Sequence, residues 1–192
     1  MCRCYGIFTL RHWQAGLGKK LGIIGIGGLG KMGVKLAHAM GALIVAFTNS
    51  ESKHQDAFDL GAQEVVVSRN PDKTAAHAGS FDFILNTVAA IHSLDQFTAL
   101  LKRDGTMTLV GEPEHPHPSP GIGMLSFARK SIAGSLIGSI AETQEMPDFC
   151  AENGIVADIE MVAAPDIETA DERMQRSDVK YRFVIDSSTL AD

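Results

Sequence analysis

The sequence predicts an α/β protein with a doubly wound parallel sheet. Short apolar segments rich in β-branched residues alternate with stretches whose apolar residues recur at helical spacing. These segments are apolar throughout, which is typical of parallel strands buried on both faces. Right-handed crossovers and two βαβαβ halves would place six such strands in the order 3-2-1-4-5-6, the Rossmann arrangement. A C-terminal α/β extension follows the sixth strand.

The first strand and the first helix are joined by a glycine-rich turn. After the apolar residues 21–24, Gly25, Gly27 and Gly30 have the spacing G-x-G-x-x-G, and a helical pattern covers residues 29–40. In such a turn the first glycine permits the tight bend, the second lets the backbone approach a pyrophosphate, and the third allows close packing of helix on strand. The helix start then directs free N–H groups at the phosphates. The turn therefore predicts a dinucleotide site; the alternative is a glycine-rich joint without a ligand.

The remaining elements follow from the same patterns, and irregular chain is expected over residues 1–18. Further strands are expected at residues 42–47, 64–67, 81–86, 106–111, 132–137, 158–163 and 181–186. Further helices are expected at residues 50–60, 70–78, from 93 to the glycine at 105, 143–153 and 166–176.

Capping residues mark the ends of these helices. Ser50 and Asp166 are expected N-caps, and Ser93 with Gln96 has the spacing of a capping box. Gly105 is expected to end the helix that this box begins, before a strand at residues 106–111. That helix would bury the apolar residues Leu94, Phe97, Leu100 and Leu101.

Ligands of open α/β sheets bind at the carboxyl ends of the strands, where the strand order reverses. This rule places four segments around one crevice. They are residues 25–30, 48–50, 86–88 and 110–111.

Composition limits the possible functions. The chain has 192 residues, a formal net charge of −6 and 45% hydrophobic residues, which suits one globular domain with an extension. No basic stripe is visible, so a nucleic-acid partner is not expected. The apolar runs are too short for a membrane span, and the charged residues near the start argue against a signal peptide. Three cysteines, an odd number, suit a reducing cytoplasm better than a disulfide framework.

Residues 112–118, with the sequence EPEHPHP, interrupt the alternation. Two glutamates and two histidines in this segment raise the alternative of a metal site. The prolines favour a stiff helix of about three residues per turn, which splays these side chains apart. No metal is therefore expected there.

Several long segments resemble a known family. They read GIIGIGGLGKMGVKLAHAMGA, LGAQEVVVSRN, LKRDGTMTLVGEPEHPHPSP, SIAGSLIGSIAETQEMPDFCAENGIVADIE and DVKYRFVID. Together they are similar to the zinc-dependent medium-chain alcohol dehydrogenases, in the branch of cinnamyl alcohol dehydrogenases and bacterial aldehyde reductases. The resemblance implies hydride transfer between NADPH and an aldehyde. It also implies three parts: a remnant of the junction to a catalytic domain (1–18), an NAD(P)-binding Rossmann domain (19–140) and an extension that returns to the catalytic domain (141–192).

The zinc chemistry of this family resides largely in a preceding catalytic domain that this sequence does not contain. Cys4 resembles the third catalytic zinc ligand of the family, with Cys2 as a competing candidate. A catalytic zinc needs three protein ligands. The chain alone is therefore expected to hold no catalytic residue and no zinc, and to reduce aldehydes poorly. A catalytically inactive nucleotide-binding or dimerisation module is the alternative.

The choice between NAD and NADP depends on the turn after the second strand. NAD enzymes place an acid there for the ribose 2′-hydroxyl. Here Thr48, Asn49 and Ser50 occupy that turn, and Lys53 can supply positive charge to a 2′-phosphate. Glu51 argues for NAD, but an acid is also favourable in the first turn of a helix. The turn predicts NADP, and the resemblance implies the same.

The resemblance extends the cofactor contacts to further residues. Those expected around the glycine turn and the later strand ends are Gly28, Leu29, Asn86, Thr87, Val88, Val110, Gly111, Ser135 and Ile137. Arg182 resembles a phosphate-contacting arginine; the alternative is a surface charge at a strand edge.

The resemblance also implies a homodimer formed along the edge of the sheet. This edge would consist of residues 123–127 and 132–137, which are mostly apolar. Unpaired strand groups together with apolar side chains favour twofold pairing. In the alternative, residues 112–120 fold over the edge and leave a monomer.

Overall fold

The computed structural model describes residues 4–176, 178–179 and 182–190, without the side chains of residues 4, 5 and 52. The chain divides into two compact units, Met1–Ile155 and Val156–Asp192. The predicted division after residue 140 stays a prediction.

The larger unit contains a six-stranded parallel sheet in the order β3-β2-β1-β4-β5-β6, which confirms the predicted fold. The strands are β1 (Lys20–Ile24), β2 (Leu43–Thr48), β3 (Glu64–Val67), β4 (Phe81–Asn86), β5 (Leu101–Leu109) and β6 (Ser131–Gly134). The smaller unit pairs β7 (Glu160–Ala163) in parallel with β8 (Phe183–Asp186). The predicted strand at residues 181–186 included Tyr181, which lies outside the described residues.

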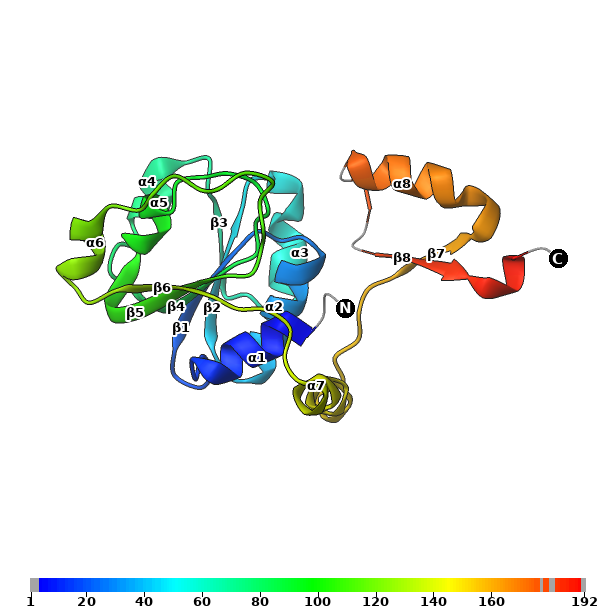
Figure 1. Ribbon diagram of the computed structural model, residues 1–192, viewed down its shortest axis with the longest axis horizontal. Helices are drawn as coiled ribbons and strands as arrows, with labels where there is room; N and C mark the ends of the chain where they lie inside the picture. Colours follow the sequence, from blue (N-terminus) through cyan, green and yellow to red (C-terminus); the bar gives the residue numbers. More distant parts are fainter. Residues whose placement is uncertain (1–3, 177, 180–181, 191–192) are drawn as a thin grey trace. The chain divides into compact units, whose positions relative to one another are not determined.

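Helices lie on both sides of the six-stranded sheet, with α2 and α3 on one side and α4 and α5 on the other (Figure 1). The α-helices are α1 (Cys4–His12), α2 (Gly28–Ala39), α3 (His54–Asp59), α4 (Pro71–Ala75), α5 (Asp95–Thr98), α6 (Ile122–Ser126), α7 (Ile140–Glu152) and α8 (Ile167–Gln175). Short 3-10 turns are η1 (Glu51–Lys53), η2 (Ala164–Asp166) and η3 (Ser187–Thr189).

Residues on alternate positions of the strands form the two layers of the core. On one face Phe47 and Ile84 pack with Phe97 of α5, and all three are at most 5% exposed. On the other face Ile23 and Leu85 are fully buried close to Gly33 of α2. The strands are thus covered on both faces, which explains why their sequences are apolar throughout.

The expectation of irregular chain over residues 1–18 was wrong, because α1 occupies part of it. Ile7 and Leu10, three residues apart, are fully buried, and α1 packs on α2. Thr9 lies between them and is also buried, where its hydroxyl donates to Oγ of Ser135 at 2.7 Å. The polar Thr9 interrupts the apolar pattern of the helix, and its partner Ser135 lies 126 residues later in the sequence. Local sequence therefore did not indicate this helix.

The predicted helix from Ser93 to Gly105 was wrong at both ends. Leu94, not Ser93, is the N-cap of α5, and the helix ends at Thr98. Strand β5 already pairs with β4 at Leu101, and Gly105 lies within this strand at a shift of register. The predicted buried face is nevertheless correct, since Leu94, Phe97, Leu100 and Leu101 are all at most 5% exposed. The apolar residues therefore predicted burial correctly but not secondary structure. Pairing with β4 places Leu101 in a strand in spite of its helix propensity.

Other boundaries differ by a few residues. A 3-10 turn, η1, follows Ser50, and α3 begins only at His54. Asp166, in contrast, is the N-cap of α8 as predicted, and it is also the last residue of the 3-10 turn η2. The sixth strand ends at Gly134, so Ser135 and the residues after it lie beyond the strand.

Candidate functional site

A cleft of about 570 Å³ lies at the carboxyl ends of β1, β2 and β4, where the strand order reverses. Nine of the predicted cofactor residues line it together. They are Gly25, Gly27, Gly28, Leu29, Thr48, Asn49, Lys53, Thr87 and Val88.

The floor of the cleft is the glycine turn between β1 and α2. Gly25 has φ +88°, a left-handed conformation that favours glycine, and its N–H donates to the carbonyl of Phe47 at 2.9 Å. The Thr87 hydroxyl lies 2.9 Å from the carbonyl oxygens of both Ile24 and Gly25. A β-carbon at Gly30 would lie 1.8 Å from the Gly25 carbonyl oxygen. The turn is therefore held rigidly, and helix α2 starts directly against it.

Gly27 differs from Gly25 and Gly30 because it faces open space. A β-carbon there would meet no atom within 4 Å, and its φ of −100° is one that any residue adopts. The fold therefore does not require glycine at this position. A ligand that approaches the backbone here would require it, which fits the predicted role beside a pyrophosphate.

The wall along β2 is polar. The N–H of Ser50 donates to the Thr48 hydroxyl oxygen at 3.2 Å, which forms a tight turn at the strand end. Both the N–H and the hydroxyl of Ser68 donate to the Thr48 carbonyl, at 2.8 and 3.2 Å. The end of β3 is thereby tied to the end of β2. Lys53 projects from η1 into the same cleft.

The wall after β4 contains a histidine whose neutral form is held in place. His92 Nδ1 lies 2.8 Å from the Ala90 carbonyl and must donate to it, so Nε2 accepts from the Asn86 amide at 2.9 Å. Asn86 Oδ1 is already occupied as the acceptor of the Val88 N–H, which orients the amide. Burial lowers the pKa of His92, and the neighbouring His117 lowers it further, outweighing the bond to Ala90. A neutral imidazole therefore lines the cleft at neutral pH.

Several predicted residues lie behind or beside the cleft. Gly30 packs against the Gly25 carbonyl behind the turn, and Ser50 lines a neighbouring hollow. Asn86 is buried, and the N–H groups of Val110 and Gly111 donate to its carbonyl at 3.0 and 3.4 Å.

Two further predicted residues do not line the cleft, and a third belongs to the other compact unit. Ser135 is bonded to Thr9, and Ile137 is half exposed beyond β6. Arg182 belongs to the smaller unit, where its carbonyl accepts from the Glu160 N–H at 2.8 Å. Their proposed contacts with a cofactor stay predictions.

Sequence reasoning missed some cleft residues. Those with polar or aromatic side chains are Phe47, Ser68, His92, Gln96 and Phe97. Ser68 follows directly after β3, so the rule of strand carboxyl ends could have found it if applied to the third strand. His92 and Gln96 come from the long connection after β4, whose path only the tertiary structure reveals.

A metal centre does not assemble in the part of the chain that is described. Among those residues no three histidine, cysteine, aspartate or glutamate side chains are placed to hold an ion. His117, from the proline-rich segment, packs edge-to-face on His92 with ring centroids 4.7 Å apart. Cys2 lies outside the described residues, as does the side chain of Cys4.

Comparison with known proteins places this geometry in a family. Residues 28–152 match the family model of the zinc-binding dehydrogenases. The chain belongs to this family. The match runs from the start of α2 to the end of α7, and the predicted resemblance to this family is confirmed.

Curated relatives match nearly the whole chain. The aldehyde reductase YahK of Escherichia coli is 68% identical over 98% of this chain and 55% of its own length. An NADP-dependent alcohol dehydrogenase C of Mycobacterium tuberculosis is 49% identical over 97% of this chain and 55% of its own length. The chain therefore spans about half the length of the curated relatives it matches.

Solved structures of the family have the same fold. A cinnamyl alcohol dehydrogenase from Sorghum bicolor matches with a TM-score of 0.93 and 38% identity, over 97% of this chain and 53% of that structure. A cinnamyl alcohol dehydrogenase from Helicobacter pylori, complexed with NADP(H), matches with a TM-score of 0.87 and 33% identity, over the same shares of both chains.

None of the helices among the described residues has the length and apolar character that a membrane span requires.

Proposed function

We propose that this chain is the NADP(H)-binding part of an alcohol dehydrogenase that reduces aldehydes. The observation that carries the proposal is the cleft that combines the glycine turn with an acid-free polar wall and Lys53. Relatives named as an aldehyde reductase and as NADP-dependent alcohol dehydrogenases support the reaction class. In this proposal residues 19–140 bind the cofactor, residues 1–18 belong to the junction with a catalytic domain, and residues 141–192 return to it.

The residues of the cleft suit a dinucleotide phosphate. Gly27 leaves room for a pyrophosphate at the start of α2, where the first N–H groups of a helix lack intrahelical partners. Asn49 and Lys53 supply amide and ammonium donors for the adenosine end, and Thr48 lines the cleft beside them. Val88, after β4, lines the same cleft as a nonpolar contact. When bound, the nicotinamide supplies the hydride, and the protein binds and orients it.

The described residues do not fit a catalytic zinc, because no set of three ligands comes together among them. The second candidate function is a nucleotide-binding or dimer-forming module without turnover, which the same cleft would serve. A cytoplasmic location suits the odd number of cysteines, three in all.

The purified chain is expected to bind NADPH at least about tenfold more tightly than NADH. Charge-assisted bonds to a 2′-phosphate contribute about 1.5–3 kcal/mol, and each 1.4 kcal/mol is about tenfold in affinity. The wall after β2 offers neutral and cationic donors and presents no acid to the cleft. Calorimetric titration with both cofactors measures the ratio, and equal affinities or a preference for NADH would contradict the assignment.

We also propose a homodimer formed along the β6 edge of the sheet. Apolar side chains are exposed there, with Ile122 at 72%, Phe127 at 94% and Leu136 at 68%. An edge strand has unpaired backbone groups, and a second copy would cover both these groups and the apolar surface. Light scattering at high micromolar concentration is expected to give a dimer, and Phe127→Lys to give a monomer. A monomeric wild-type chain would contradict the dimer, and a dimeric variant would contradict this choice of edge.

A further inference from the structure

A second hollow of about 720 Å³ lies beside the cofactor cleft, between the turn after β2 and the connection from β3 to α4. Asn49 lines both spaces, so they adjoin at this residue. Ser50 from the β2 side and Arg69 from the β3 side line the second hollow as well. Arg69 has no role in the cofactor site as proposed so far.

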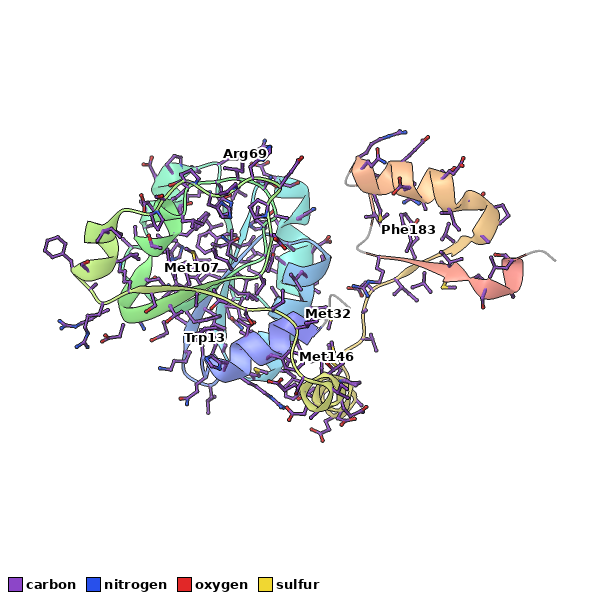
Figure 2. The ribbon with its side chains drawn as sticks, in the orientation of Figure 1. Trp13, Met32, Arg69, Met107, Met146 and Phe183 are labelled. Carbon is purple, nitrogen blue, oxygen red and sulfur yellow. The ribbon has the colours of Figure 1, made fainter. Side chains whose placement is uncertain are left out.

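Strand pairing places Arg69 beside the predicted 2′-phosphate turn. Thr48 and Val67 are register partners at the ends of β2 and β3. One step further, Ser68 lines the cofactor cleft and binds the Thr48 carbonyl through two hydrogen bonds. Arg69 is the next residue, and Figure 2 shows it at the end of the sheet opposite Trp13. Its backbone position is therefore tied to the turn that contains Asn49 and Ser50.

The charge of Arg69 is available to a ligand. Arg11, Arg129 and Arg173 each form an ion pair with a carboxylate, but Arg69 forms none with the described residues. The other charged groups of the hollow are Lys73 and Glu51, so cations outnumber anions there. This local excess of positive charge lies next to the cleft of a chain whose net charge is −6.

We propose that Arg69 determines cofactor specificity by binding the 2′-phosphate of NADP(H) in the hollow between Ser50 and the β3–α4 connection. This inference rests on the proposed function, and it adds to the cofactor site a residue that follows β3. A guanidinium presents a planar fork of donors that binds two phosphate oxygens at once, whereas the Lys53 ammonium acts as a point charge. Arg69 therefore recognises the phosphate group through paired hydrogen bonds. Lys53 adds electrostatic attraction from the other side of the turn.

The test compares Arg69→Gln with Arg103→Gln, which removes the same charge from a hollow that contains Trp13 at the opposite end of the sheet. Calorimetric titration of each variant and of the wild-type chain uses NADPH, NADH, 2′-AMP and 5′-AMP. Arg69→Gln is expected to weaken the binding of NADPH and 2′-AMP about tenfold and to leave the affinities for NADH and 5′-AMP unchanged. Arg103→Gln should match the wild type, and Arg69→Lys should lie between, because the charge remains without the fork.

The outcomes separate this inference from the proposed function. If the wild type prefers NADPH and Arg69→Gln keeps that preference, Arg69 is not the specificity residue, while NADP binding stands. Equal weakening of NADPH and NADH would also overturn the inference, since Arg69 would then act on a part common to both cofactors. A wild-type chain that binds neither cofactor would overturn the proposed function together with the inference. Circular dichroism melting controls for folding, which an exposed arginine should not affect.

Discussion

Replacing Gly30 by alanine is expected to destabilise the domain by about 3 kcal/mol or more, because overpacking against a rigid backbone cannot relax cheaply. The new β-carbon would lie 1.8 Å from the Gly25 carbonyl oxygen and 3.0 Å from the Thr87 hydroxyl. Relief requires α2 to move away from the end of β1, which also disrupts the cofactor cleft. Urea unfolding and NADPH titration measure the two losses, and both are expected.

The matched control is Gly27→Ala, three residues earlier in the same turn. A β-carbon at Gly27 meets no atom within 4 Å, and its backbone conformation suits alanine. This variant should unfold at the wild-type urea concentration but bind NADPH at least about tenfold more weakly, because the methyl occupies the space of the pyrophosphate. Unchanged binding would place the pyrophosphate elsewhere. Wild-type stability of Gly30→Ala would contradict the tight packing of α2 on the turn.

Truncation of Phe47 to alanine is expected to cost about 3–5 kcal/mol of unfolding free energy, the usual range for a buried phenylalanine. Its side chain is 1% exposed and contacts Phe81 and Phe97 at centroid distances of 5.7 and 5.8 Å. It also lines the cofactor cleft, so binding should weaken together with stability. Denaturant unfolding of the variant against the wild type measures the cost.

Phe127→Ala provides the control for this prediction, since it is the same chemical change at a side chain that is 94% exposed. At a protein concentration low enough to dissociate the proposed dimer, its effect should stay within about 0.5 kcal/mol, as is usual for surface substitutions. Similar losses for both variants would mean that the two positions are equally buried in solution, contrary to the buried Phe47 and the exposed Phe127 of the structure.

The sequence by itself determined the strand order and most of the cleft floor. Parallel strands buried on both faces must be apolar throughout, so β1 and β4 are recognisable from local composition. The glycine spacing is equally local, because a turn of a few residues must satisfy its own backbone geometry. Gly25, with its positive φ, shows this most directly.

Tertiary structure decided the features that depend on partners distant in the sequence. Helix α1 exists because Ile7 and Leu10 have α2 to pack against, and Leu101 joins a strand because β4 offers hydrogen bonds. Arg69 lies beside the turn after β2 only because β3 pairs with β2 and Ser68 binds Thr48. Local patterns report the burial and backbone needs of a segment, but the neighbours of a side chain follow from the packing of whole elements.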